Sequence, residues 1–152
     1  MDPLFRKLNL KDHDPIVVLD APASFEAQLD ALRGVHVLRA FPSDDPVEFV
    51  IAFATRLRQV EALAAALADG VRGDAIVWVA WPKKTSRRFT CEFDRDTGFS
   101  ALGTAGFEGV RAVAIDEDWS ALRFRRTSFI ARLTRDPSRA LSDEGRKRTG
   151  GQ

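Results

Sequence analysis

The chain contains short, continuous apolar runs separated by segments with helical periodicity. The clearest runs lie at residues 16–19, 49–53 and 75–81. A strand has a continuous apolar sequence when both faces of its sheet are covered, which is typical of a parallel sheet. The alternation of such strands with amphipathic helices favours an α/β fold.

Helix signals occupy the intervals between these runs. Asp2 is a predicted N-cap with Pro3 in the first helical turn. Ser24 is predicted to cap a second helix that ends near Gly34. Thr55 is predicted to cap a third helix that ends at residues 69–70. Its expected buried stripe is Leu57, Val60, Leu63, Ala64 and Leu67, and a further short helix is predicted over 97–105.

Six strands are predicted in all. Their ranges are 16–19, 35–38, 49–53, 75–81, 110–115 and 121–125. The link between the last two strands is so short that it permits only an antiparallel pair. Right-handed crossovers and short connections then predict the strand order 2-1-3-4-6-5. The expected fold is a doubly wound, mostly parallel sheet that ends in an antiparallel hairpin.

The charge distribution divides the 152-residue chain. From Arg126 onward, seven Lys and Arg residues face three acidic residues, whereas the chain as a whole carries a net charge of only +1. Residues 1–125 are therefore predicted to be one domain. Residues 126–152 are predicted to be a basic, largely disordered tail, because they contain few apolar residues to offset the entropy of ordering. A short helix around Phe129, Ile130 and Leu133 is the alternative for its first part.

Composition excludes several other classes of protein. No apolar run reaches the ~20 residues of a membrane span, and the N-terminus lacks the apolar core of a signal peptide, so a cytoplasmic location is expected. The single cysteine, Cys91, and the two histidines provide neither a disulfide nor a structural zinc site. The Walker and G-x-G-x-x-G phosphate-binding motifs are absent. No metal and no cofactor are predicted.

The most suggestive polar residues follow the fourth predicted strand. Lys83 and Lys84, with the hydroxyl groups of Thr85 and Ser86, are predicted to form an anion site where that strand ends, and Arg87 and Arg88 would extend it. The alternative is structural. In that case Lys83 pairs with Asp20 across the edge of the sheet, and Lys84 is solvated.

The predicted hairpin turn carries three acidic residues and an indole. Trp119 is expected to fold back over the sheet and cover the core, although an exposed stacking role is the alternative. Arg123 is expected to pair with Asp116 or Asp118. The acidic residues lack the glycine-containing loop of a cation site, so no metal is assigned to them.

Residues 14–125 resemble the class I methyltransferases, with one strand and one helix fewer. That resemblance implies an S-adenosylmethionine (SAM) site after the first strand, where glycines let the backbone approach the cofactor. Here the turn at residues 20–24 is Asp-Ala-Pro-Ala-Ser and contains no glycine. No acidic residue directly follows the second strand to hold a ribose. The resemblance thus implies a degenerate cofactor site.

A second resemblance is carried by two short segments. Residues 78–86, with the sequence WVAWPKKTS, and residues 115–124, with the sequence IDEDWSALRF, resemble those of a small bacterial family described as a domain of unknown function. Its short N-terminal helix is similar to PLFRKL at residues 3–8. This resemblance implies no known activity.

The resulting functional hypothesis is a binding or interaction module that takes a protein partner or a small anion. One alternative is an enzyme for a phosphorylated or carboxylated metabolite, with Lys83 or Lys84 as electrophilic stabiliser. The other is an atypical SAM-dependent methyltransferase. Nucleic acid is expected to make only weak contacts with the basic tail, because residues 1–125 have no basic stripe with stacking aromatic residues.

Overall fold

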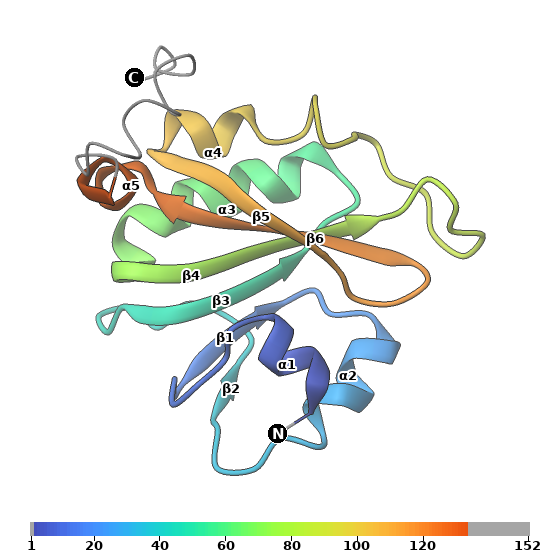
Figure 1. The fold of residues 1–152 in the computed structure, drawn as a ribbon, viewed down its shortest axis with the longest axis horizontal. Coiled ribbons are helices and arrows are strands. Elements are labelled where there is room, and N and C mark those ends of the chain that lie inside the picture. The colour runs from blue at the N-terminus through green and yellow to red at the C-terminus, as the bar shows by residue number, and fades with distance from the viewer. Residues whose placement is uncertain (1, 134–152) are drawn as a thin grey trace.

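The computed structural model describes residues 2–133 and is built on one six-stranded sheet (Figure 1). The strands are β1 (Ile16–Leu19), β2 (Val37–Leu38), β3 (Val47–Phe53), β4 (Val71–Pro82), β5 (Phe107–Ala114) and β6 (Trp119–Arg126). The helices are α1 (Pro3–Lys7), α2 (Ala23–Leu29), α3 (Leu57–Gly70), α4 (Ser100–Thr104) and α5 (Thr127–Leu133).

The sheet confirms the predicted topology. Its order is β2-β1-β3-β4-β6-β5. The strands β1, β2, β3 and β4 are parallel, whereas β6 is antiparallel to both β4 and β5. The reversed hairpin follows from the short link, since a parallel crossover needs a dozen or more residues.

Two apolar layers enclose the sheet. One contains Phe5 and Leu8 of the α1 region and Phe25 of α2, which pack against Phe49, Ile51 and Trp78. The other contains side chains of α3 and α4 packed on the alternate residues of β3 and β4. Figure 1 shows α1 and α2 together on one side and α3 and α4 on the other. Coverage of both faces explains the continuous apolar runs of the central strands.

The element boundaries differ from the predictions where the sequence signal is weak. β2 is limited to Val37–Leu38 rather than 35–38, because it pairs only with the start of β1 at the edge of the sheet. α2 ends at Leu29, before the predicted stop at Gly34. α4 covers only Ser100–Thr104 of the predicted 97–105, since residues 94–97 form a turn around the Asp94 carboxylate.

Of the three predicted side-chain caps, Asp2 is confirmed, since its Oδ1 accepts from the Leu4 N–H at 2.8 Å, whereas those assigned to Ser24 and Thr55 are wrong. The N-cap of α2 is Pro22, and the Ser24 hydroxyl instead donates to Asp116. The N-cap of α3 is Arg56, and the Gln59 carboxamide oxygen accepts from the backbone N–H groups of Thr55 (2.8 Å) and Arg56 (3.0 Å). The side chain that bonds the free backbone N–H groups at the start of α3 is therefore Gln59 in the first turn, not Thr55 before it.

Ordered structure continues beyond the predicted domain boundary at residue 125. β6 extends to Arg126, and α5 then occupies the position of the short helix considered for Phe129, Ile130 and Leu133. The remainder of the predicted tail, residues 134–152, lies outside the described residues. Within residues 2–133, no helix has the length and apolar character required to cross a membrane.

Candidate ligand site at the carboxyl edge of the sheet

The strands β1, β3 and β4 all end at one edge of the sheet, which we call the carboxyl edge. After β1 the chain turns to α2 on one face, and after β3 it turns to α3 on the opposite face. The gap between β1 and β3 is therefore the topological switch point, where ligands bind in open α/β sheets. The loop after β4 and the turn between β5 and β6 reach the same edge, because Pro82 is paired with Trp119.

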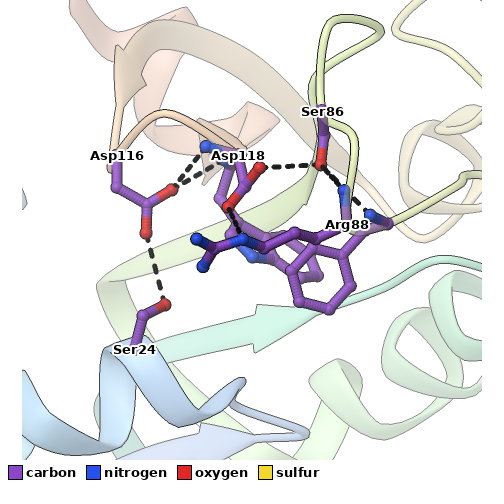
Figure 2. A network of polar contacts seen from close by, with 7 residues as sticks. Ser24, Ser86, Arg88, Asp116 and Asp118 are labelled. Carbon is purple, nitrogen blue, oxygen red and sulfur yellow. Dashed lines mark hydrogen bonds and ion pairs between the residues drawn. The ribbon is translucent and has the colours of Figure 1, made fainter.

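A buried carboxylate joins the loop after β4 to the hairpin turn. Asp118 is only 7% exposed. It accepts a hydrogen bond from the Ser86 hydroxyl at 2.8 Å, and its other oxygen lies 4.0 Å from Arg88 Nε (Figure 2). Its backbone carbonyl accepts from the Lys83 N–H at 2.8 Å. The two segments are thereby held together across the end of β4.

Asp116 ties the same turn to the start of α2. Its Oδ1 accepts from the backbone N–H groups of Asp118 (2.8 Å) and Trp119 (2.9 Å), and its Oδ2 accepts from the Ser24 hydroxyl at 3.3 Å. Figure 2 shows Asp116 and Asp118 side by side between Ser24 and Ser86. Both carboxylates therefore bond the segments that form the carboxyl edge. The described residues contain no group of three or more His, Cys, Asp or Glu side chains that could hold a metal ion.

Trp119 confirms the expectation that its indole covers the core. It is 3% exposed and lies edge-on to Phe53, with ring centroids 5.2 Å apart. The ring of Phe89 packs against it at 5.0 Å. Its Nε1 is buried without a hydrogen-bond partner within the described part of the chain. The indole therefore helps to hold the loop after β4 in place.

The predicted ion pair between Arg123 and Asp116 or Asp118 is not formed. It lies opposite Trp78 in the middle of β6, so its guanidinium is well removed from the turn that carries Asp116 and Asp118. Its Nη1 instead approaches the Asn9 side-chain oxygen at 3.5 Å. The alternation of residues along a strand determines which face Arg123 occupies, but its partner depends on the loop after α1.

Three of the predicted anion residues, Lys83, Lys84 and Ser86, line a cavity of about 570 Å³ beyond β4, whereas Thr85 does not belong to its lining. Lys83 is half-buried, while Lys84 and Thr85 are exposed. The Ser86 hydroxyl donates to Asp118 and accepts from the Phe89 N–H at 3.1 Å, so it anchors the loop. Among residues 2–133, neither lysine ammonium group makes a hydrogen bond or an ion pair.

The alternative considered for Lys83, an ion pair with Asp20, is not formed. Asp20 instead accepts from Gln59 Nε2 at 3.2 Å, and this hydrogen bond bridges the ends of β1 and β3.

Lys84 is close enough to Asp94 to influence the pKa of its carboxyl group. Hydrogen bonds from Thr97 lower the pKa of the Asp94 carboxyl group, and the positive charge of Lys84 lowers this pKa further.

A second cavity, of about 370 Å³, was not predicted from the sequence. It lies at the switch point between Leu19 and Asp20 on one side and the small side chains of Ala62 and Ala66 on the other. The direct connection from β2 to β3 leaves this part of the α3 face without a second helix. The sequence feature that could have indicated this cavity is the lack of a helical pattern between residues 39 and 46.

Cys91 also lines the larger cavity. Burial is the main cause that raises the pKa of its thiol, and the charges of Glu92 and Asp94 raise this pKa further. A raised pKa decreases the thiolate fraction at neutral pH, and the thiolate is the nucleophile. The electrostatic environment therefore does not activate Cys91.

Comparison with solved structures finds the same fold in methyltransferases. A SAM-dependent methyltransferase from Aquifex aeolicus matches with a TM-score of 0.57 and 14% identity over 81% of this chain and 87% of that one. The N-methyltransferase NodS from Bradyrhizobium japonicum matches with a TM-score of 0.53 and 12% identity, covering 81% and 92% of the two chains. Identities this low establish the fold alone. No family model matches the sequence, and no curated protein matches it.

The residues at the end of β1 do not fit a methyltransferase cofactor loop. Ala21 packs against the apolar layer beneath α1 and α2, and Pro22, which has no N–H to offer, caps α2. At the end of β2, Arg39 forms a two-pronged ion pair with Glu26, with both N–O distances at 2.8 Å. The position at which an acidic residue would hold a ribose is thus occupied by a paired cation.

Proposed function

We propose that this chain is a binding domain with a methyltransferase fold, and that it holds a small anion at the carboxyl edge rather than transferring a methyl group. The observation that carries this proposal is the pair of lysines, Lys83 and Lys84, without partners on a loop that is itself anchored. Ser86, Asp118 and Trp119 fix the loop, so its cations are displayed at little further cost in conformational entropy.

The chemistry of the loop favours a phosphorylated or carboxylated small molecule. Lys83 and Lys84 supply charge-assisted donors, and the exposed Thr85 hydroxyl adds a neutral one. The cavity of about 570 Å³ beside them lies within the range of small-molecule sites. Asp94 and Glu92 line the same cavity, so an anion would have to sit at the lysine end of it.

Calorimetric titration of the full chain with pyrophosphate and with citrate tests this function. We expect saturable binding that is weakened at least about tenfold in the double variant Lys83→Ala, Lys84→Ala, since each charge-assisted contact contributes about 1.5 kcal/mol or more. Lys11→Ala, which removes an exposed lysine far from the carboxyl edge, is the matched control. Equal affinity in all three proteins would refute the proposal.

The fold and the cavity at the switch point favour a second candidate, which is SAM-dependent methyl transfer in an atypical site. The cavity of about 370 Å³ adjoins Leu19 and Asp20, at the end of the strand that precedes the cofactor loop of that fold. Ala66→Phe would fill this cavity from α3. If SAM binds the native chain, Ala66→Phe abolishes this binding, and pyrophosphate shows no saturable binding, this second candidate replaces the first.

A further inference from the structure

A separate group of cations lies away from the carboxyl edge, where β5 and β6 pass the end of α1. Arg111 of β5 is paired directly with Arg123 of β6. The pairing depends on a bulge, because Gly109 faces Phe124 and the next aligned residue is Arg111 rather than Val110. Residues directly opposite on adjacent strands project from the same face, and like charges placed there are destabilising.

The two guanidinium groups share one neutral acceptor. The Asn9 side-chain oxygen accepts from Arg111 Nη1 at 2.7 Å and is 3.5 Å from Arg123 Nη1. Arg123 Nε is buried and has no hydrogen-bond partner among the described residues. No carboxylate of residues 2–133 forms an ion pair with either arginine.

Arg125, on the same strand, differs because it has a carboxylate partner. Two residues beyond Arg123 on β6, its Nε and Nη2 both donate to the carboxylate of Asp74, and Glu108 is its partner in the register of β5. Asp74 is therefore already engaged. Arg111 and Arg123 differ from Arg125 in having only a shared amide oxygen.

Because Arg123 is half-buried, the lack of a carboxylate partner for its guanidinium group is energetically unfavourable. Loss of water around Arg123 lowers its guanidinium pKa, and the nearby charges of Arg125 and Arg111 lower this pKa further, while Asp74 opposes the change. An arginine remains protonated at neutral pH even so. A charged group that is half-buried and incompletely hydrogen-bonded is expected to recruit an anion.

We propose that Arg111 and Arg123 bind a phosphate group between β5, β6 and Asn9. Two guanidinium groups from adjacent strands can each present paired donors, which suits a tetrahedral anion with several acceptor oxygens. Lys7 of α1 joins the helix to the same strand, since its Nζ donates to the backbone carbonyl of Ala114 on β5 at 2.7 Å. The phosphate could belong to a small molecule or to a nucleic acid backbone, and the experiment separates these sources.

The test is titration of the full chain, followed through the NMR signal of the Arg123 Nε–Hε group. The chain carries Lys83→Ala and Lys84→Ala, so that binding at the carboxyl edge does not contribute and the two proposals are judged separately. Pyrophosphate is expected to shift the Arg123 signal with saturation. Arg111→Gln, at an exposed position where folding is not at risk, is expected to weaken this binding at least about fivefold. Arg72→Gln, on an exposed arginine paired with Glu48, is the control and should leave it unchanged.

A mixed 12-nucleotide single-stranded DNA is the second probe. If the DNA saturates the Arg123 signal at lower concentration than pyrophosphate and Arg111→Gln weakens it, the phosphate belongs to a nucleic acid; the reverse order of affinity assigns it to a small molecule. An Arg123 signal that neither probe shifts, or equal binding by the Arg111→Gln and Arg72→Gln proteins, overturns the proposal.

Discussion

Asp118 is the buried charged side chain of the described residues, and its surroundings explain why it is tolerated. A carboxylate removed from water is strongly unfavourable unless it is hydrogen-bonded. The Ser86 hydroxyl supplies a short hydrogen bond, and Arg88 supplies a more distant positive charge. Since Ser86 and Asp118 come from different segments, the bond between them also stabilises the geometry of the carboxyl edge.

Asp118→Ala is expected to lower the free energy of unfolding by about 2 kcal/mol, because it leaves the Ser86 hydroxyl and its loop without their acceptor. Ser86→Ala should cost a similar amount. Urea unfolding of both variants and of the double variant measures the coupling. A double variant that loses the full sum of the single effects would show that the bond contributes nothing, which contradicts this account.

Asp14 provides a test in acid. The backbone N–H and the ring of His36 donate to its carboxylate, at 2.7 Å and 3.0 Å, and these hydrogen bonds lower the pKa of Asp14 below its ordinary value of 3.8. The native state therefore favours the ionised form. Its stabilising effect is present above pH 3.8 and is lost as the pH falls through the lowered value.

The difference in unfolding free energy between the native chain and Asp14→Asn should therefore be constant near neutral pH and shrink in acid below pH 3.8. Urea titrations at a series of pH values measure it. Asp12→Asn, at an exposed carboxylate two residues earlier, controls for the change in net charge. A difference for Asp14→Asn that does not vary with pH would show that this interaction is absent.

The helices and strands owe their positions partly to side chains that join them. Gln59 in the first turn of α3 accepts from the backbone N–H groups of Thr55 and Arg56, and it also donates to Asp20 after β1. One carboxamide thus completes the start of the longest helix and joins the two strand ends at the switch point.

Gln59→Ala is expected to lower the free energy of unfolding by about 1 kcal/mol, the usual cost of losing a helix cap. Arg58→Ala, on the exposed neighbouring residue, is the matched control and should cost little. Urea unfolding compares the two. Equal stabilities of the Gln59→Ala and Arg58→Ala proteins would show that the cap does not stabilise α3.

The sequence predicts an element well where a continuous apolar run or a regular stripe is long. The interiors of β1, β3, β4 and α3 belong to this class, and the exposed Leu57 at the start of α3 is the main deviation from its predicted stripe. Some caps are harder to predict, because they depend on contacts outside the local pattern. Gln59 rather than Thr55 accepts from the backbone at the start of α3, and the Ser24 hydroxyl donates to Asp116 instead of capping α2.

In the candidate site too, features set by the local sequence could be predicted, whereas contacts between distant residues could not. Lys83 and Lys84 could be placed at the carboxyl edge because they follow an apolar run that ends at a proline. The bond between Ser86 and Asp118 joins residues 32 positions apart, and the pairing of Arg111 with Arg123 needs a bulge at Val110. Such contacts depend on register and loop shape, which local periodicity does not encode.

At the scale of the whole molecule, the chain has a methyltransferase fold, and its turn after β1 contains no glycine. Ala21 is partly buried and packs against the core, Pro22 is the N-cap of α2, and Arg39 is paired with Glu26. At the same edge, the network of Asp116 and Asp118 fixes a loop that carries unpaired lysines. These features are the basis of our proposal that the carboxyl edge binds an anion and that the chain does not transfer a methyl group.

Calorimetric titration of the full chain with SAM tests this central claim most directly. We expect no saturable heat up to millimolar SAM, under the conditions in which pyrophosphate gives a saturable titration. Micromolar affinity for SAM that changes in Pro22→Gly or Asp20→Ala would contradict the account, because it would place the methyl donor against the turn at residues 20–24.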